Sequence, residues 1–224
     1  MNANPDRVEQ EVKAAVAGQE GEVREEVRRI TLEALSDGRL DTDAVRRVMH
    51  SVMHGARQGA EALGEQGRQS LSDAMQGLDE ALGAAAEATD LALREAAARG
   101  GEFSRQELRR SLDDLAGLEA LFIETMKNAA KGATGFAATT LHDFAEHARS
   151  SGTYVGGKVE GSLAQLRHSL GDLARAQIEV GAHGLRSGSA LLANIAAGFL
   201  AGIAQRLEPE KVKKDDSDPS APRD

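Results

Sequence analysis

The sequence contains no cysteine and no tryptophan, and only 3% of its 224 residues are aromatic. The absence of cysteine excludes disulfide bonds and thiolate chemistry. Aromatic side chains bury the largest areas, whereas alanine, which supplies much of the 41% hydrophobic fraction, buries little. The composition therefore favours narrow seams between helices over a thick globular core.

Proline is absent from the whole interior of the chain. The four prolines are Pro5, Pro209, Pro219 and Pro222. Because an interior proline costs a helix roughly 3 kcal/mol, residues 6–208 are free to form very long helices. The 24 glycines oppose this, since each costs a helix interior about 1 kcal/mol relative to alanine. We predict an all-α protein of long amphipathic helices, arranged as a helical hairpin or an elongated bundle.

An excess of positive charge is also missing, because the formal net charge is −9. Without a basic stripe interleaved with aromatic residues, the chain is a poor candidate for nucleic-acid binding, which depends on phosphate neutralisation. The first ten residues, MNANPDRVEQ, contain no apolar signal-peptide core. We therefore expect no nucleic-acid partner and a cytoplasmic location, with peripheral association with a membrane or granule as a further option.

Capping and turn signals divide the chain into four parts. Asn4 and Pro5 read as an N-cap and a first helical residue, which predicts one helix over residues 5–36. The dipeptide Gly100-Gly101 precedes a segment of capping-box form, and a second cluster of breaking residues follows Ser150. The predicted parts are an N-terminal helix (1–40), a long amphipathic helical region with breaks near 100–103 and 150–157 (41–186), an apolar Ala/Gly-rich helix (187–207) and a disordered tail (208–224).

An apolar stripe recurs at every eleventh residue of the chain. Eleven residues in three turns is 3.67 residues per turn, so such a stripe stays on one face of a nearly straight helix. An ordinary amphipathic helix also keeps this phase over a few turns, and both interpretations stay open. The positions are Ala60, Leu71, Leu82, Leu93, Ser104, Leu115, Met126, Ala137, Ala148, Val159, Leu170, Gly181, Leu192 and Ile203.

Residues 54–86, HGARQGAEALG, EQGRQSLSDAM and QGLDEALGAAA, resemble the eleven-residue repeats of late-embryogenesis-abundant and perilipin-type proteins. The plan of polar helices plus one apolar segment is also similar to that of bacterial phasins, which coat polyhydroxyalkanoate granules. The resemblance implies a helical coat protein. Because the chain lacks the lysine richness of the plant-type repeats, the resemblance does not extend to desiccation protection.

The segment Ser187 to Gln205 is uncharged and rich in alanine. At 1.5 Å per residue its length approaches the roughly 30 Å of a bilayer core, which leaves three options: a helix buried in protein, insertion into a lipid-like surface, or a membrane span. Close packing of helices is expected at two GxxxG spacings, Gly184/Gly188 and Gly198/Gly202. The residues expected to contact a surface or a second copy are Leu191, Leu192, Ile195, Phe199, Leu200 and Ile203.

No motif in the sequence predicts catalysis or a cofactor. His50 and His54 have a spacing that places two imidazoles on one helix face, but no third ligand lies nearby. His142, Glu146 and His147 lack matching elements on another helix. We interpret all of these side chains as ordinary surface or seam residues, and we expect no metal, no cofactor and no enzymatic activity.

These features predict a non-enzymatic helical coat or scaffold protein. It would associate with itself, as a homo-oligomer, and with a hydrophobic surface such as a membrane or a storage granule. The alternative is a soluble oligomeric helical adaptor in which the apolar segment is a core helix.

Overall fold

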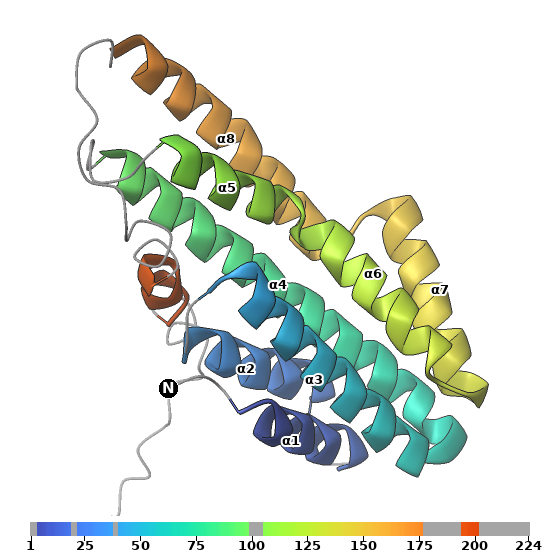
Figure 1. The fold of residues 1–224 in the computed structure, drawn as a ribbon. Coiled ribbons are helices and arrows are strands. Elements are labelled where there is room, and N and C mark those ends of the chain that lie inside the picture. The colour runs from blue at the N-terminus through green and yellow to red at the C-terminus, as the bar shows by residue number, and fades with distance from the viewer. Residues whose placement is uncertain (1–3, 19–21, 38–39, 99–104, 177–193, 202–224) are drawn as a thin grey trace, which may run out of the picture.

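The computed structural model describes residues 4–18, 22–37, 40–98, 105–176 and 194–201, except for the side chains of residues 105, 107 and 167–176. Of the residues described, 92% are helical, and none of them lies in a β-strand. The helices pack side by side in a bundle (Figure 1). The predicted all-α fold class is confirmed.

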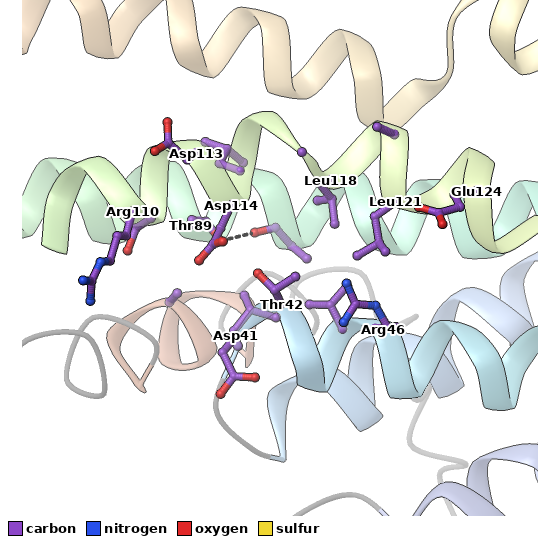
Figure 2. Close-up of a pocket in the computed structure, with 18 residues that line it drawn as sticks. Asp41, Thr42, Arg46, Thr89, Arg110, Asp113, Asp114, Leu118, Leu121 and Glu124 are labelled. Carbon is purple, nitrogen blue, oxygen red and sulfur yellow. Dashed lines mark hydrogen bonds between the residues drawn. The ribbon is translucent and has the colours of Figure 1, made fainter. Parts of the chain in front are cut away.

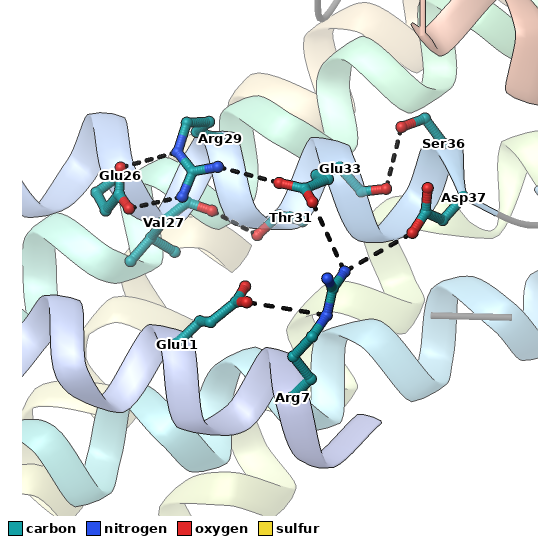
Figure 3. A network of polar contacts seen from close by, with 9 residues as sticks. All are labelled: Arg7, Glu11, Glu26, Val27, Arg29, Thr31, Glu33, Ser36 and Asp37. Atoms are coloured by element: carbon teal, nitrogen blue, oxygen red, sulfur yellow. Dashed lines mark hydrogen bonds and ion pairs between the residues drawn. The ribbon is translucent and has the colours of Figure 1, made fainter. Parts of the chain in front are cut away.

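The single helix predicted over residues 5–36 is wrong, because the chain forms two helices there, α1 (Pro5–Ala17) and α2 (Val23–Ser36). The helix α1 ends at Gly18, whose ψ of 127° is extended. Arg7, near the start of α1, lies 3.6 Å from Glu33 and 3.7 Å from Asp37, near the end of α2, so the two helices run antiparallel (Figure 3). Periodicity did not reveal the break, since the apolar phase continues across it.

The next two helices form a second antiparallel hairpin against the first. They are α3 (Thr42–Ala62) and α4 (Gly67–Ala98), joined through the 3₁₀ turn η1 (Gly64–Gln66). The helix α1 packs on α3, and α2 packs on α4. Gly55 of α3 lies against Glu9 of α1, and Gly59, one turn later, lies against Lys13, so α1 and α3 run parallel.

Four further helices complete the bundle: α5 (Arg105–Ala116), α6 (Leu118–Lys131), α7 (Gly135–Ser151) and α8 (Tyr154–Ala176). The break expected near 100–103 falls between α4 and α5, outside the described residues. Within the break expected near 150–157, α7 ends at Gly152, whose φ of 79° favours glycine. Further interruptions of the predicted helical region 41–186, at η1, at Gly117 and between α6 and α7, had no counterpart in the prediction.

The helix α4 lies at the centre of the bundle and contacts every other α-helix from α1 to α8 (Figure 1). Its middle is buried on all faces, because residues 81–86 are all buried. Those residues are alanine and glycine apart from Leu82, and small side chains let several helices approach one axis closely. A helix that is apolar all round is normally buried, and α4 follows that rule.

The eleven-residue stripe lines the interior of the bundle. Because the chain reverses between successive helices, the stripe does not follow one straight helix, yet its described members all face inward. Each has at most 5% of its surface exposed. They are Ala60, Leu71, Leu82, Leu93, Leu115, Met126, Ala137, Ala148 and Val159.

No described helix is both long enough and apolar enough to cross a membrane. The segment expected to be apolar, residues 187–207, is described only over residues 194–201, which are helical. The predicted tail, residues 208–224, lies outside the described residues.

Candidate functional site

The described part of the apolar segment, residues 194–201, is seated against the bundle core. Leu200 is fully buried, and Ala196 and Ala197 are 2% and 6% exposed. Ile195 and Phe199 are only partly buried, and they pack against the edge of the same core. The helix therefore presents its alanine face and Leu200 inward and leaves its Ile195–Phe199 ridge half-covered.

The remaining predicted contact and packing residues are placed as follows. Leu191, Leu192, Ile203, Gly184, Gly188 and Gly202 lie outside the described residues. Gly198 is exposed, and a Cβ atom built there would meet no atom within 4 Å. Among the described residues, Gly198 is thus not a point of close helix packing.

Close helix packing occurs instead at glycines for which the sequence analysis made no prediction. A Cβ atom at Gly55 would lie 2.3 Å from the carbonyl oxygen of Glu9 in α1, and one at Gly59 would lie 2.7 Å from that of Lys13. A Cβ atom built at Gly77 of α4 would likewise lie 2.3 Å from the carbonyl oxygen of Arg24 in α2. The GxxxG spacing of Gly55 and Gly59 is the signal that could have identified the α1–α3 seam.

A pocket of about 430 Å³ opens beside the seat of residues 194–201. Figure 2 shows it between the start of α3 and the continuous run of α5 and α6, with α4 behind. Its floor consists of buried apolar residues from four segments: Leu40, Val45, Ala85, Leu115, Leu118 and Ala196. A concave, mostly apolar cavity of this size is typical of a small-molecule site.

Local capping and backbone geometry place the walls of this pocket. The N-cap of α3 is Asp41, whose carboxylate accepts a hydrogen bond of 2.9 Å from the backbone N–H of Ala44. Gly117 joins α5 to α6 with nearly helical torsions, and its N–H donates to the carbonyl of Asp113 at 2.9 Å. The sequence analysis found no sign of the pocket, because its walls come from segments far apart in the chain.

Charged groups surround the mouth of the pocket. Arg46 is engaged, because its guanidinium donates to Asp43 at 3.1 Å. Within the part of the chain that the structure describes, Asp114, Glu124 and Arg110 make no side-chain hydrogen bond or ion pair, and the same holds for Asp113. Asp113 points away from the pocket, Arg110 and Asp114 lie at one end of it, and Glu124 lies at the other end (Figure 2), so these charges do not gather at one point of the mouth.

A second polar cluster lies at the start of α8, away from the pocket. Oδ2 and Oδ1 of Asp79 in α4 accept hydrogen bonds of 2.8 and 2.9 Å from the N–H groups of Tyr154 and Val155. Glu119 of α6 accepts from the N–H and hydroxyl of Thr153, at 3.1 and 2.8 Å. Burial raises the pKa of Asp79, the charge of Glu119 raises it further, and the two backbone hydrogen bonds lower it.

Arg94 pairs with the buried Asp90 of its own helix and links α4 to α8. Asp90 Oδ2 lies 2.8 Å from Arg94, and Arg94 also donates to Gln165 of α8. Asp90 Oδ1 and Arg94 Nε have no hydrogen-bond partner among the described atoms. Through its hydrogen bond to Gln165, Arg94 connects α4 with α8.

The histidines form no candidate metal centre in the described residues, where no group of three potential ligands occurs. His54 Nδ1 lies 2.8 Å from Glu9 Oε1, and Gln58 donates to the same carboxylate at 3.0 Å. His54 therefore lies in the polar margin of the α1–α3 seam. His50, His142 and His147 are exposed on their helices.

Comparison with known proteins gives one match. The model of a family of unknown function, DUF6781, matches residues 1–209. No curated protein and no solved structure matches the chain.

Proposed function

The chain belongs to the family of unknown function DUF6781, and we propose that it is a non-enzymatic helical scaffold protein with its apolar C-terminal helix built into the core. The observation that carries this proposal is the complete burial of Leu200, beside the buried Ala196 and Ala197. Burying one leucine stabilises a fold by about 1.5–3 kcal/mol. A segment held in this way acts as a structural helix of the adaptor.

The scaffold would act through protein contacts on its helix faces, in the cytoplasm, and we include self-association among these contacts. The half-covered ridge of Ile195 and Phe199 supports this part of the proposal. Both side chains pack on the core and retain exposed surface, so a second copy could cover them and remove further apolar area from water. The ridge is therefore the proposed contact between copies.

A second candidate function is the coating of a hydrophobic surface such as a membrane or a storage granule. It is favoured by the same half-covered ridge, because the sequence continues it at four-residue spacing to Leu191 and Ile203. In this role, the ridge would lie against lipid or polymer. The two functions therefore differ in what covers the Ile195–Phe199 ridge: a second copy of the protein in the first, and lipid or polymer in the second.

Three single substitutions within one helix test the proposal. Leu200→Asp places a charge in the core and should lower the free energy of unfolding by at least about 3 kcal/mol, because a buried unpaired charge costs that much. Phe199→Asp should lower the melting temperature less than Leu200→Asp does, because Phe199 is only partly buried, and it should dissolve the oligomer. Asn194→Asp, which adds the same charge on the exposed face, is the control and should behave like wild type.

Melting curves, sedimentation velocity and flotation with liposomes distinguish the outcomes. An oligomeric wild type that does not float supports the scaffold. Flotation of wild type that is lost in Phe199→Asp supports the surface coat. A Leu200→Asp variant that melts with wild type contradicts the core helix, and a monomeric wild type that never floats contradicts both functions.

A further inference from the structure

The Ile195–Phe199 ridge borders the pocket. Of residues 194–201, Ala196 lines the pocket, whereas Ile195 and Phe199 do not. At 3.6 residues per turn, Ala196 points between the fully buried Leu200 and the half-buried Phe199. The ridge therefore lies on the flank of this helix that is nearer to the pocket.

The pocket can receive side chains of the size found in the ridge. Its volume of about 430 Å³ is larger than an aromatic and an aliphatic side chain together, and its floor includes Val45, Leu115 and Leu118. Gly117 and Ala120, which also line it, are too small to close it. One face of the protein thus carries a half-covered apolar ridge and, beside it, an apolar recess.

The charges around the pocket favour a protein as the group that covers this face. Arg110 and Asp114 lie at one end of the pocket and Glu124 lies at the other (Figure 2). Lipid tails or an uncharged polymer cannot pair these groups, and removing charges from water without a partner is costly. A second copy presents the same groups of both signs, so charges can be paired across the contact.

We propose that the pocket is the docking surface for the Ile195–Phe199 ridge of a second copy. Because ridge and pocket lie side by side, a two-fold axis between the copies forms both contacts at once and closes the assembly as a dimer. Phe199 of each copy is then the aromatic anchor in the pocket of the other, the arrangement in which a few side chains carry most of the binding energy. The inference rests on the self-association proposed above and adds its partner surface.

Filling the pocket tests the inference without touching the ridge. Ala120 of α6 and Ala116 of α5 are both exposed, and of the two only Ala120 lines the pocket. We expect Ala120→Trp to raise the dissociation constant of the dimer at least tenfold in sedimentation experiments, and Ala116→Trp to leave it unchanged. Wild-type dimerisation of Ala120→Trp, with a wild-type melting curve, would overturn the inference.

Mixing two defective variants tests the reciprocal geometry. Phe199→Asp keeps its pocket and loses its ridge, whereas Ala120→Trp keeps its ridge and loses its pocket. Each variant alone should be monomeric, because both symmetry-related contacts are broken. In the mixed pair both defects fall in the same contact and the other contact is intact, so heterodimers should form at concentrations where neither variant dimerises. A mixture that stays monomeric there would contradict docking of the ridge in the pocket.

The same measurements separate this inference from the proposed function. If the copies met ridge against ridge, Phe199→Asp would be monomeric, Ala120→Trp would dimerise like wild type, and self-association would stand without the pocket. A wild type that stays monomeric would overturn the self-association and the inference together.

Discussion

Asp79 Oδ1, in the middle of α4, accepts a hydrogen bond of 2.9 Å from the backbone N–H of Val155 at the start of α8. The first N–H groups of a helix have no partner within that helix, and a carboxylate also complements the positive end of the helix dipole. Here, the carboxylate comes from another helix, 76 residues away in sequence. Asp79 therefore fixes both the start of α8 and its position on α4.

Replacing Asp79 with alanine should destabilise the bundle markedly. The change leaves two backbone N–H groups, on Tyr154 and Val155, without an acceptor, and each buried unsatisfied group costs about 1–3 kcal/mol. We expect urea unfolding to give a loss of roughly 2–5 kcal/mol. The exposed change Asp143→Ala is the control and should be nearly neutral. A loss below about 1 kcal/mol in Asp79→Ala would show that water or another group replaces the carboxylate.

The pH dependence of stability should carry a signature of Asp79. Burial raises the pKa of its carboxyl above the ordinary value of 3.8, so the ionised form is less favourable in the folded protein than in the unfolded chain. The free energy of unfolding contributed by Asp79 should therefore increase as the pH falls through the folded-state pKa toward 3.8.

Urea unfolding of wild type and Asp79→Asn across this pH range isolates the effect, because the other carboxyl groups contribute to both proteins. The stability difference, wild type minus variant, should increase toward acid pH. A difference that decreases instead would mean that the backbone hydrogen bonds outweigh burial and that the pKa of Asp79 is lowered.

The α1–α3 seam should not tolerate even one added methyl group. Gly55→Ala would place a Cβ atom 2.3 Å from the carbonyl oxygen of Glu9, so the two helices must move apart. Overpacking of this kind costs about 1–3 kcal/mol. Gly157→Ala, in open space on α8, should instead stabilise by about 0.5–1 kcal/mol through helix propensity. Thermal unfolding of both variants checks the prediction, and equal shifts in the same direction would contradict it.

The sequence predicted the helical class and the inward stripe better than the path of the chain. The stripe from Ala60 to Val159 is buried wherever the structure describes it, because a period near 3.6 marks one face of any helix. The period does not report where the chain reverses. Val16 and Val23 keep the same phase although α1 and α2 run antiparallel, so a straight helix and a hairpin share one pattern.

Contacts between residues close in sequence could be predicted, whereas contacts between distant segments could not. The caps at Asn4 and Asp41 were readable, since their partners lie two or three residues away. Asp79 could not be distinguished from the many acidic residues on solvent-facing helices, because its role depends on Tyr154 and Val155. The pocket was equally hidden, since it forms only when α3, α4, α5 and α6 converge.

The ionic contacts between α1 and α2 should stabilise the bundle only slightly and in a salt-dependent way. Arg7 lies within 3.8 Å of Glu11 in its own helix and reaches Glu33 and Asp37 of α2 (Figure 3). All four side chains are 40–50% exposed, so water and ions screen them. Arg7→Gln should lower the free energy of unfolding by up to about 1 kcal/mol at low salt.

At 1 M sodium chloride, where the screening length is about 3 Å, the effect of Arg7→Gln should nearly vanish. Arg29→Gln is the matched comparison, because Arg29 is equally exposed and donates to Glu26 and Glu33 within α2 alone. Its removal should weaken α2 without altering the pairing of α1 with α2. Amide hydrogen exchange along α1 distinguishes the two cases: protection of α1 should fall in Arg7→Gln and not in Arg29→Gln. Equal loss in both variants would mean that α1 is held by its buried valines and not by this ionic contact.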